Sequence, residues 1–260
     1  MLAKLRMRLE VDKPEFGYYQ SSNMQGVLME QLGSDYAEVL HEQGLKPYSQ
    51  HILSGETCEW VVNTYTSEAY QKIMLPLLEE KFKQITLEKG GVHIQICSKE
   101  LKTASRQELL DEFYSEQYSR YLNLEFITPT AFKSNGKYVI MPDTRYIYQS
   151  LMNKYSAASS DMEMYDEETL EQLVNNSSIV QYRLRSTSFP MEGIRIPSFK
   201  GEISIKITGT GIMAKYARLL ARFGEYSGIG IKTAIGMGAL RIKGIPIADT
   251  VTGRERRQAE

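Results

Sequence analysis

Cysteine is nearly absent from this chain: Cys58 and Cys97 are the two copies among 260 residues, and they lie far apart in sequence. No Cys-x-x-Cys pair is present, which excludes a disulfide framework or a cysteine cluster and favours a reduced, cytoplasmic location. The first residues do not have the pattern of a signal peptide, and no apolar run approaches the ~20 residues that a membrane helix needs. We therefore expect no membrane partner.

An excess of charge is lacking as well. The chain carries 31 Lys and Arg against 32 Asp and Glu, a net charge of −1, which by itself argues mildly against a nucleic-acid partner. Binding follows the local potential rather than the sum, however. Basic residues outnumber acids over 215–243 and over 182–200, whereas acids gather over 161–171. The C-terminal half is therefore polarised, which is compatible with RNA binding and with an ordinary solvated surface.

The first half of the chain predicts the element order strand, helix, strand, strand, helix, strand, which is the ferredoxin-like βαββαβ pattern. The evidence is alternating apolar and polar residues in strands and a 3.6-residue apolar period in helices. The predicted elements are a strand over 2–11, helical spacing over 24–40, a hairpin over 50–65, an amphipathic helix over 67–82 and a strand pair over 86–98.

The second half repeats this order more loosely. Strands are predicted over 121–128, 179–188, 203–208 and 239–245, and helices over 143–155, 167–175 and 211–223, with 191–201 joining two strands. The predicted fold is α+β, with two tandem ferredoxin-like (RRM-like) domains. We place the domains at 1–120 and 121–247, and we expect the charged tail 248–260 to be disordered.

The most distinctive segment is 228–238, Gly-Ile-Gly-Ile-Lys-Thr-Ala-Ile-Gly-Met-Gly, which holds four of the 19 glycines. A P-loop or a Rossmann fingerprint lies between a strand and a helix, whereas here a predicted helix precedes and a strand follows. A nucleotide site is therefore not favoured. Two interpretations stay open: a tight structural turn, or a loop whose N–H groups meet RNA phosphates, with Lys232 adding charge and Thr233 or Ser227 adding hydrogen bonds.

The segment resembles the C-terminal glycine-rich loop of the RAMP superfamily, and specifically that of the CRISPR-associated endoribonucleases that process precursor CRISPR RNA. The family's pattern is Gly-apolar-Gly, five residues that usually include a basic one, then Gly-apolar-Gly. The matching residues are Gly228, Gly230, Gly236 and Gly238. The resemblance covers nearly the whole chain, because the family has two tandem ferredoxin-like domains, and it implies that this segment, with Lys232 and Thr233, binds RNA.

The resemblance also implies metal-independent RNA cleavage, in which a 2′-hydroxyl attacks the adjacent phosphate and leaves 2′,3′-cyclic phosphate and 5′-hydroxyl ends. Histidine suits the proton transfers of this reaction, and a cation stabilises the charge that develops. His41 and Lys46 match the family's catalytic histidine and downstream lysine. Some members add a tyrosine earlier in the helix, where this chain has Met29. Tyr36 and Tyr48 are nearby in sequence, with no basis for choosing between them.

Other candidate residues are weaker. Without the family resemblance, His41 would be interpreted as a surface histidine at a helix C-terminus, where the helix dipole favours its charged form. His51 lies in an adjacent predicted strand, and His93 lies in an alternating strand where a structural role is favoured. No His-Glu-x-x-His or other metal-ligand spacing is present, so no metal and no other cofactor is implied. Arg183 and Arg185 lie on a predicted strand of the second domain, as phosphate contacts or as ordinary exposed charges.

These observations predict an endoribonuclease that cleaves CRISPR repeat RNA to produce crRNAs. The alternative is a non-catalytic RNA-binding RAMP subunit of a CRISPR effector complex, which keeps the glycine-rich segment and needs no histidine. A third interpretation is a ferredoxin-like small-molecule sensor or enzyme in which the segment is a turn. The expected partner is CRISPR repeat RNA, while a homodimer and a place in an effector complex stay open.

Overall fold

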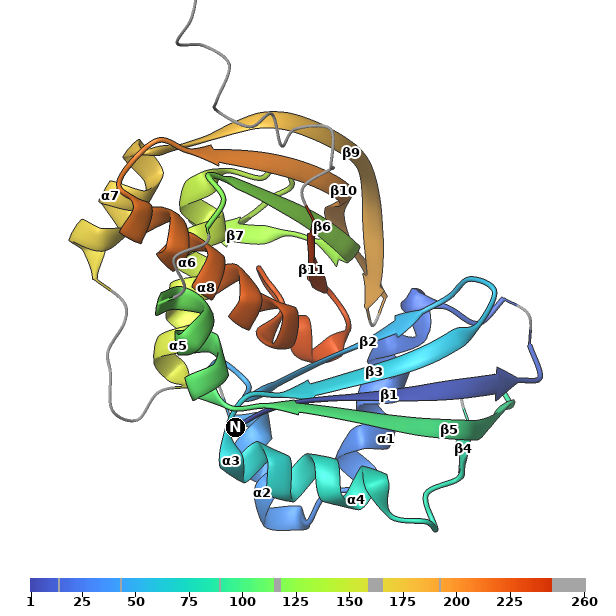
Figure 1. Ribbon diagram of the computed structural model, residues 1–260. Coiled ribbons are helices and arrows are strands. Elements are labelled where there is room, and N and C mark those ends of the chain that lie inside the picture. The colour runs from blue at the N-terminus through green and yellow to red at the C-terminus, as the bar shows by residue number, and fades with distance from the viewer. Residues whose placement is uncertain are drawn as a thin grey trace, which may run out of the picture.

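Two antiparallel β-sheets lie side by side, each with helices on one face (Figure 1). The structure is a computed structural model that describes residues 1–13, 15–42, 44–88, 90–114, 118–158, 166–191 and 193–244. The predicted α+β class is confirmed. The predicted disordered tail, 248–260, lies outside the described residues. No helix of the described part is long and apolar enough to cross a membrane.

The first sheet has the strand order β2-β3-β1-β5-β4, and all its neighbouring strands are antiparallel. Its strands are β1 (Leu2–Val11), β2 (Tyr48–Leu53), β3 (Cys58–Thr64), β4 (Gln84–Leu87) and β5 (Val92–Ala104). In β1 the apolar residues of the alternating pattern, such as Leu5 and Met7, are fully buried against the helices, whereas Arg8 on the other face is exposed. The alternation therefore sets which face of the sheet stays open.

Helices cover one face of the first sheet. They are the 3₁₀ turn η1 (Tyr18–Gln20), α1 (Ser21–Glu30), α2 (Ser34–His41), α3 (Ser67–Ala69), the π-helical turn η2 (Tyr70–Met74) and α4 (Leu75–Leu78). The continuous helix from α3 to α4 ends at Leu78, so the prediction that it extends to residue 82 was wrong. The chain leaves helical geometry at Glu79 (ψ 142°). Phe82 is then buried, with its ring centroid 6.4 Å from that of Trp60.

The second sheet has the order β11-β6-β10-β9, again antiparallel throughout. Its strands are β6 (Tyr121–Thr130), β9 (Ser177–Met191), β10 (Ile194–Ile207) and β11 (Leu240–Lys243), and a small hairpin of β7 (Phe132–Ser134) and β8 (Lys137–Val139) follows β6. Its helices are α6 (Thr144–Ala157), α7 (Glu167–Asn175) and α8 (Gly211–Ser227). The sheet buries Leu124, Phe126 and Ile205 against this helical layer.

Residues 191–201 do not form the predicted connection between two strands. They belong to one long β9–β10 hairpin that turns between Met191 and Ile194. Ile196 and Phe199 are buried, and Pro197 lies before β10 begins to pair with β6, where a missing backbone donor is tolerated. A bulge at Gly201 (φ +131°) then bends β10. The prolines and glycines of this stretch therefore shape a strand rather than break it.

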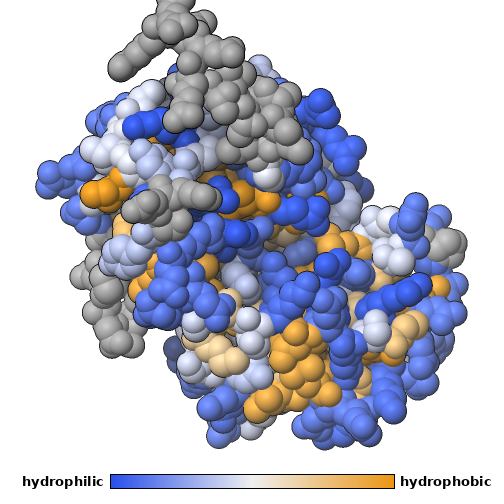
Figure 2. All heavy atoms as spheres, in the orientation of Figure 1, coloured by the Kyte–Doolittle hydropathy of each residue, from blue (hydrophilic) through white to orange (hydrophobic). Residues whose placement is uncertain are grey.

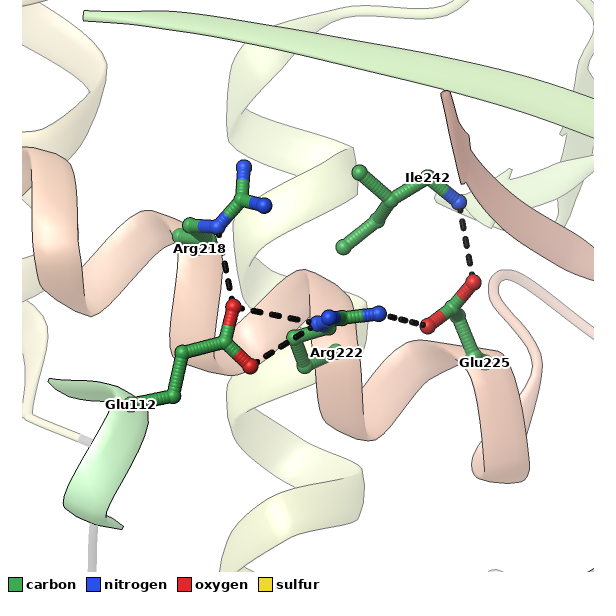
Figure 3. Close-up of polar contacts among 5 residues, drawn as sticks. All are labelled: Glu112, Arg218, Arg222, Glu225 and Ile242. Atoms are coloured by element: carbon green, nitrogen blue, oxygen red, sulfur yellow. Dashed lines mark hydrogen bonds and ion pairs between the residues drawn. The ribbon is translucent and has the colours of Figure 1, made fainter. Parts of the chain in front are cut away.

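A helix that was not predicted, α5 (Arg106–Tyr114), follows the first sheet and packs on α8. Glu112 of α5 accepts hydrogen bonds from Arg218 (3.1 Å) and Arg222 (2.9 Å) of α8 (Figure 3). Arg222 also pairs with Glu225, which in turn accepts the backbone N–H of Ile242 in β11. This network links α5 to α8, and α8 to strand β11 of the second sheet.

Apolar side chains form a separate large cluster under each sheet, with a small third cluster at the junction. The third cluster contains Ala131, Phe189, Ile196 and Met237, with Tyr18 of the first half packed against it. The face seen in Figure 2 is mostly hydrophilic along the junction, with an apolar patch over the α3–α4 region. The two halves are therefore joined by packed side chains as well as by the chain.

Gly201 provides a test of the β10 bulge. A Cβ atom there would lie 2.0 Å from the carbonyl oxygen of Arg183, so Gly201→Ala should lower the free energy of unfolding by about 3 kcal/mol. Gly136→Ala is the matched control, because Gly136 also has positive φ (+77°) but open space around it, and it should cost about 1 kcal/mol. Urea unfolding of both variants measures the difference, and equal losses would contradict the bulge geometry.

Candidate nucleic-acid interface and active site

The glycine-rich segment 228–238 connects α8 to β11 and contains the 3₁₀ turn η3 (Thr233–Ile235). Its four glycines all have positive φ, from +66° at Gly228 to +114° at Gly236. Space is equally restrictive: a Cβ on Gly238 would lie 1.9 Å from the carbonyl oxygen of Ile229. Both the conformation and the close backbone approach therefore require glycine.

Many N–H groups of the segment donate to other protein atoms. Ile229 donates to Gly238 O (2.8 Å), Gly238 to Pro129 O (3.0 Å), Ile231 to Ala131 O (3.0 Å) and Gly230 to the Ser150 hydroxyl (2.8 Å). The first N–H groups of any helical turn have no hydrogen-bond partner within the turn, and η3 begins directly after Lys232. Lys232 is exposed there, in a left-handed conformation, whereas Thr233 is buried. RNA binding by this segment stays a prediction, and Lys232 at the tip is its accessible charge.

The segment also joins the two halves of the protein. Ala234 belongs to the apolar cluster under the first sheet. A Cβ on Gly236 would lie 2.2 Å from Cβ of Ser21 at the start of α1. Nearby, the Ser49 hydroxyl of β2 donates to the carbonyl of Tyr226 at the end of α8 (2.6 Å). The glycines therefore let the second half pack closely against α1 and β2.

A buried lysine that the sequence analysis missed lies under the segment. Lys154 of α6 is 3% exposed, and its Nζ lies 3.1 Å from Gly228 O, 3.3 Å from Thr233 Oγ1 and 3.4 Å from Ser227 O. Burial lowers the pKa of Lys154 to about 7. The sequence offered one indication that this lysine is buried: it lies three residues after Leu151, on the apolar face of the predicted helix.

The two predicted catalytic residues lie at the entry to β2. His41 is the last residue of α2 and is exposed, and Lys46 lies in the connection to β2. The Lys46 ammonium donates to the carbonyl of Glu42. The hydroxyl of Tyr65, which follows β3, donates to the carbonyl of Lys46. One hydrogen bond therefore joins the two ends of this connection, and a second ties its end at Lys46 to Tyr65.

A cavity of about 190 Å³ lies between this connection and the glycine-rich segment. Leu45, between His41 and Lys46, lines it on one side, and Gly230 and Ile231 line it on the other. Its remaining walls come from β7 and α6, through Phe132, Lys133, Tyr146, Gln149, Ser150, Asn153 and Lys154. The α2–β2 connection and the glycine-rich segment are thus adjacent, although they lie far apart in sequence. The α6 and β7 residues carried no sequence motif that pointed to them.

The other histidines and nearby tyrosines have different surroundings. His51 in β2 is buried, and burial together with Lys4, Arg241 and Arg6 lowers its pKa to about 3. His93 is exposed on β5, with Nδ1 3.4 Å from the Thr86 hydroxyl. Tyr36 and Tyr48 are both buried, and burial raises the pKa of each to about 12. Met29 packs against the first cluster. His51 is therefore neutral at ordinary pH, which makes it a poor group for proton transfer.

Basic residues gather on the uncovered faces of both sheets. Arg183 and Arg185 are exposed on the edge strand β9, opposite Glu202 and Lys200 of β10. Lys200 Nζ lies 5.3 Å from the ring centroid of Tyr18, across the junction of the two halves.

The two uncovered faces meet at the same junction. Burial lowers the pKa of Lys4 on β1; nearby Glu225 raises it, and Arg6, Arg241 and Lys102 lower it further. Arg241 belongs to β11 of the second sheet, so cations of both sheets lie within electrostatic reach of each other. Arg6, Lys102 and Arg241 each pair with a glutamate, so the charge at the junction is partly neutralised within the protein.

The described residues contain no group of three or more His, Cys, Asp or Glu side chains that could hold a metal ion. Both cysteines are free thiols, with Cys58 half-buried and Cys97 exposed.

Comparison with known proteins was made at the level of family, sequence and fold. The family model of the CRISPR-associated endoribonuclease Cas6 matches residues 124–240. A CRISPR-associated endoribonuclease Cas6 of Streptococcus thermophilus is 38% identical over 219 residues, covering 84% of this chain and 89% of the relative. The Cas6 of Mycobacterium tuberculosis (strain H37Rv) is 35% identical over 247 residues, covering 93% and 78%. A solved Cas6 product complex covers 94% of this chain and 99% of its own, with a TM-score of 0.76 at 20% identity, which shows a shared fold.

The titration of Lys154 should be visible in the stability of the protein. Its pKa in the folded protein, about 7, lies below the ordinary 10.5, so the unfolded chain binds more protons between these values. Stability should therefore rise with pH from about 7 to 10, with a slope of up to about 1.4 kcal/mol per pH unit from this group. Urea unfolding across this range should show a smaller rise for Lys154→Met, while Lys137→Met, which removes an exposed lysine, keeps the wild-type slope. Equal slopes for wild type and Lys154→Met would contradict the burial of a titrating ammonium.

Proposed function

Because the chain belongs to the CRISPR-associated endoribonuclease Cas6 family, we propose that it cleaves precursor CRISPR RNA within the repeats to produce crRNAs. The family resemblance drawn from the glycine-rich segment is confirmed by these relatives, and the chain is an endoribonuclease of that family. Beyond family membership, we propose that the substrate of this chain is precursor CRISPR RNA. It is supported by a solved Cas6 of the same fold in a product complex.

The observation that carries the proposed site is the cavity shared by the α2–β2 connection and the glycine-rich segment. Leu45 lines it together with Gly230 and Ile231. His41 and Lys46 therefore flank a short connection that faces the segment expected to hold the RNA backbone. A proton-transfer group and a cation beside a phosphate-binding loop are what metal-independent RNA cleavage needs.

The proposed reaction is an in-line transfer within the RNA. The 2′-oxygen forms a bond to the adjacent phosphorus and gives its proton to a base, while the P–O5′ bond breaks and the O5′ atom takes a proton from an acid. The products are a 2′,3′-cyclic phosphate and a 5′-hydroxyl. His41, which is exposed, moves one of these protons, and the Lys46 ammonium stabilises the negative charge on the phosphorane oxygens. The second proton-transfer group is not assigned, because Tyr36 and Tyr48 are buried.

The RNA strand on either side is proposed to follow the basic residues of the uncovered sheet faces. Arg183 and Arg185 present two exposed guanidinium groups on the same face of β9, two residues apart. Lys232 projects from the tip of the glycine-rich segment. Such groups neutralise phosphates without reading bases, so they set affinity and register rather than sequence preference.

We also propose that the two halves are ferredoxin-like domains, 1–120 and 121–247, of which 245–247 lie outside the described residues. The strand order of the second sheet, β11-β6-β10-β9, corresponds to strands 4-1-3-2 of a βαββαβ unit. The first sheet has the same order in β5, β1, β3 and β2, with β4 added at the edge.

A second candidate function is a non-catalytic RNA-binding subunit of a CRISPR effector complex. One observation favours it: Met29 takes the position of the tyrosine found in some members, and both nearby tyrosines are buried. The two functions differ in whether RNA is cut, and the next experiment separates them.

Cleavage of labelled repeat RNA in excess EDTA should occur at one site and leave a 2′,3′-cyclic phosphate. His41→Ala should lower the single-turnover rate constant by 10²-fold or more while the dissociation constant changes little, because general acid–base catalysis contributes about 10²–10⁴-fold. His93→Ala is the matched control, since His93 is also exposed but lies on β5. It should cleave at the wild-type rate. Binding without cleavage by the wild-type protein would overturn the enzyme in favour of the non-catalytic subunit.

The β9 arginines should contribute affinity through phosphate contacts. The double variant Arg183→Ala, Arg185→Ala should bind RNA on the order of tenfold more weakly. The magnitude of the slope of log K against log salt should fall by about 1 to 2, because binding with fewer phosphate contacts releases fewer counterions. Arg145→Ala is the control, since Arg145 pairs with Glu167 and Glu171 on the helical side. Fluorescence anisotropy at several salt concentrations measures both values, and an unchanged slope would contradict this RNA path.

A further inference from the structure

The side-chain nitrogen of Lys154 makes three hydrogen bonds, all to residues in or beside one segment. Its Nζ lies within hydrogen-bond distance of Ser227 O, Gly228 O and Thr233 Oγ1, which belong to the start and the middle of the glycine-rich connection. The ammonium therefore bridges the first Gly-apolar-Gly triplet and the η3 turn. A charged ammonium has three donors for these three acceptors, whereas a neutral amine has two, so protonation of Lys154 completes its hydrogen bonds to the loop.

No carboxylate pairs with this buried ammonium among the described residues of the chain. The carboxylates of the helices packed on α6 have other partners: Glu225 of α8 pairs with Arg222, and Glu171 of α7 pairs with Arg145. The other titratable groups near the cavity are Lys133 of β7, Lys232 of the segment, Tyr155 of α6, and His41, Glu42 and Lys46 at the α2–β2 connection. A buried cation without an anionic partner costs free energy, and carbonyl and hydroxyl oxygens offset only part of it. The site is therefore short of one negative charge.

The cavity offers a place for that charge. Lys154 lines the same cavity of about 190 Å³ as Gly230, Ile231 and Leu45, so this volume joins the glycine-rich segment to the connection between His41 and Lys46. Lys154 is 3% exposed and is one of the lining residues, so an anion that enters this cavity comes close to its side chain. In such a partly buried site the attraction between opposite charges is screened much less than at the surface.

We infer that Lys154 is a positioning residue of the RNA site, and that a phosphate of bound RNA draws a proton onto it. In the free protein burial holds the pKa of Lys154 at about 7, so the group is largely neutral at pH 7.5. The phosphate supplies the missing negative charge and raises this pKa. The charged ammonium then binds the carbonyls of Ser227 and Gly228 more strongly and holds the glycine-rich segment in its RNA-bound shape. This inference rests on the proposed function, since the anion is the RNA backbone.

Proton uptake is the measurement that separates this role from a purely structural one. RNA binding is followed by isothermal titration calorimetry at pH 7.5 in PIPES, HEPES and Tris, and the slope of the observed enthalpy against the buffer ionisation enthalpy gives the protons taken up. All proteins carry His41→Ala, so that this exposed side chain takes no part in the measurement. The RNA carries a 2′-deoxy nucleotide at the mapped cleavage site, so that no reaction contributes heat.

The starting protein should take up as much as about three quarters of a proton per RNA, which is the neutral fraction of a group with a pKa of about 7 at pH 7.5. Lys154→Met should abolish this uptake and weaken binding. Lys154→Arg, whose charge is permanent, should bind more tightly than Lys154→Met and also show no uptake. Lys137→Met, which removes an exposed lysine of β8, should leave the uptake unchanged.

Thr233→Val keeps the inference testable if the Lys154 variants do not fold. It removes one of the three oxygen acceptors with little change in shape, so it should lower the pKa of Lys154 and shift the uptake to lower pH. Uptake that persists unchanged in Lys154→Met or Thr233→Val overturns the inference and leaves the proposed function standing. Absence of any RNA binding by the starting protein instead overturns the proposed function, and this inference with it.

Discussion

The close packing of the glycine-rich segment against the first half of the protein is the constraint on which the rest depends. At Gly236 the backbone passes so near Ser21 that a Cβ atom has no room, and at Gly238 the backbone crosses Ile229 at hydrogen-bond distance. Because of this approach, Ala234 reaches the core of the first sheet. The position of the candidate cavity then follows, since the same segment forms one of its walls. The glycines thus serve a structural purpose first, and any contact with RNA uses the part of the segment that packing leaves accessible.

Much of the fold could be predicted from sequence because its signals are local. The alternation of Leu5 and Met7 with Arg6 and Arg8, and the apolar period of α8, follow directly from the two faces of a strand or a helix. The errors arise where tertiary contacts decide. Pro190 and Pro197 suggest a break, yet β9 and β10 continue because pairing with a neighbouring strand supports them. Helix α5 has nine residues, and one of its stabilising interactions is the ion pairing of Glu112 with α8, more than 100 residues later.

The candidate site was predictable only in part for the same reason. The family resemblance points to the glycines, His41 and Lys46 through short sequence patterns, and their roles stay a prediction. The cavity walls from α6 and β7 lie beside the glycine-rich segment because of long-range packing, and no local sequence pattern predicts that packing. Lys154 is instructive, since a lysine at an apolar helix position contradicts the local rule. An ionisable residue in an apolar position costs stability compared with an apolar residue there, so such positions are often functional.

The arrangement separates two electrostatic tasks that a single exposed cluster would combine. Lys232, Arg183 and Arg185 are exposed, so their attraction for a polyanion acts at a distance and weakens with salt. Lys154 is buried, so it contributes nothing to long-range attraction, but it responds strongly to an anion that has already arrived. His51 shows the opposite outcome of burial: with the cations Lys4, Arg6 and Arg241 around it and no access to the candidate cavity, it stays neutral and inert. Burial alone therefore does not make a titratable group functional. What distinguishes Lys154 is that it lines the cavity between the glycine-rich segment and the α2–β2 connection, where the RNA backbone is expected.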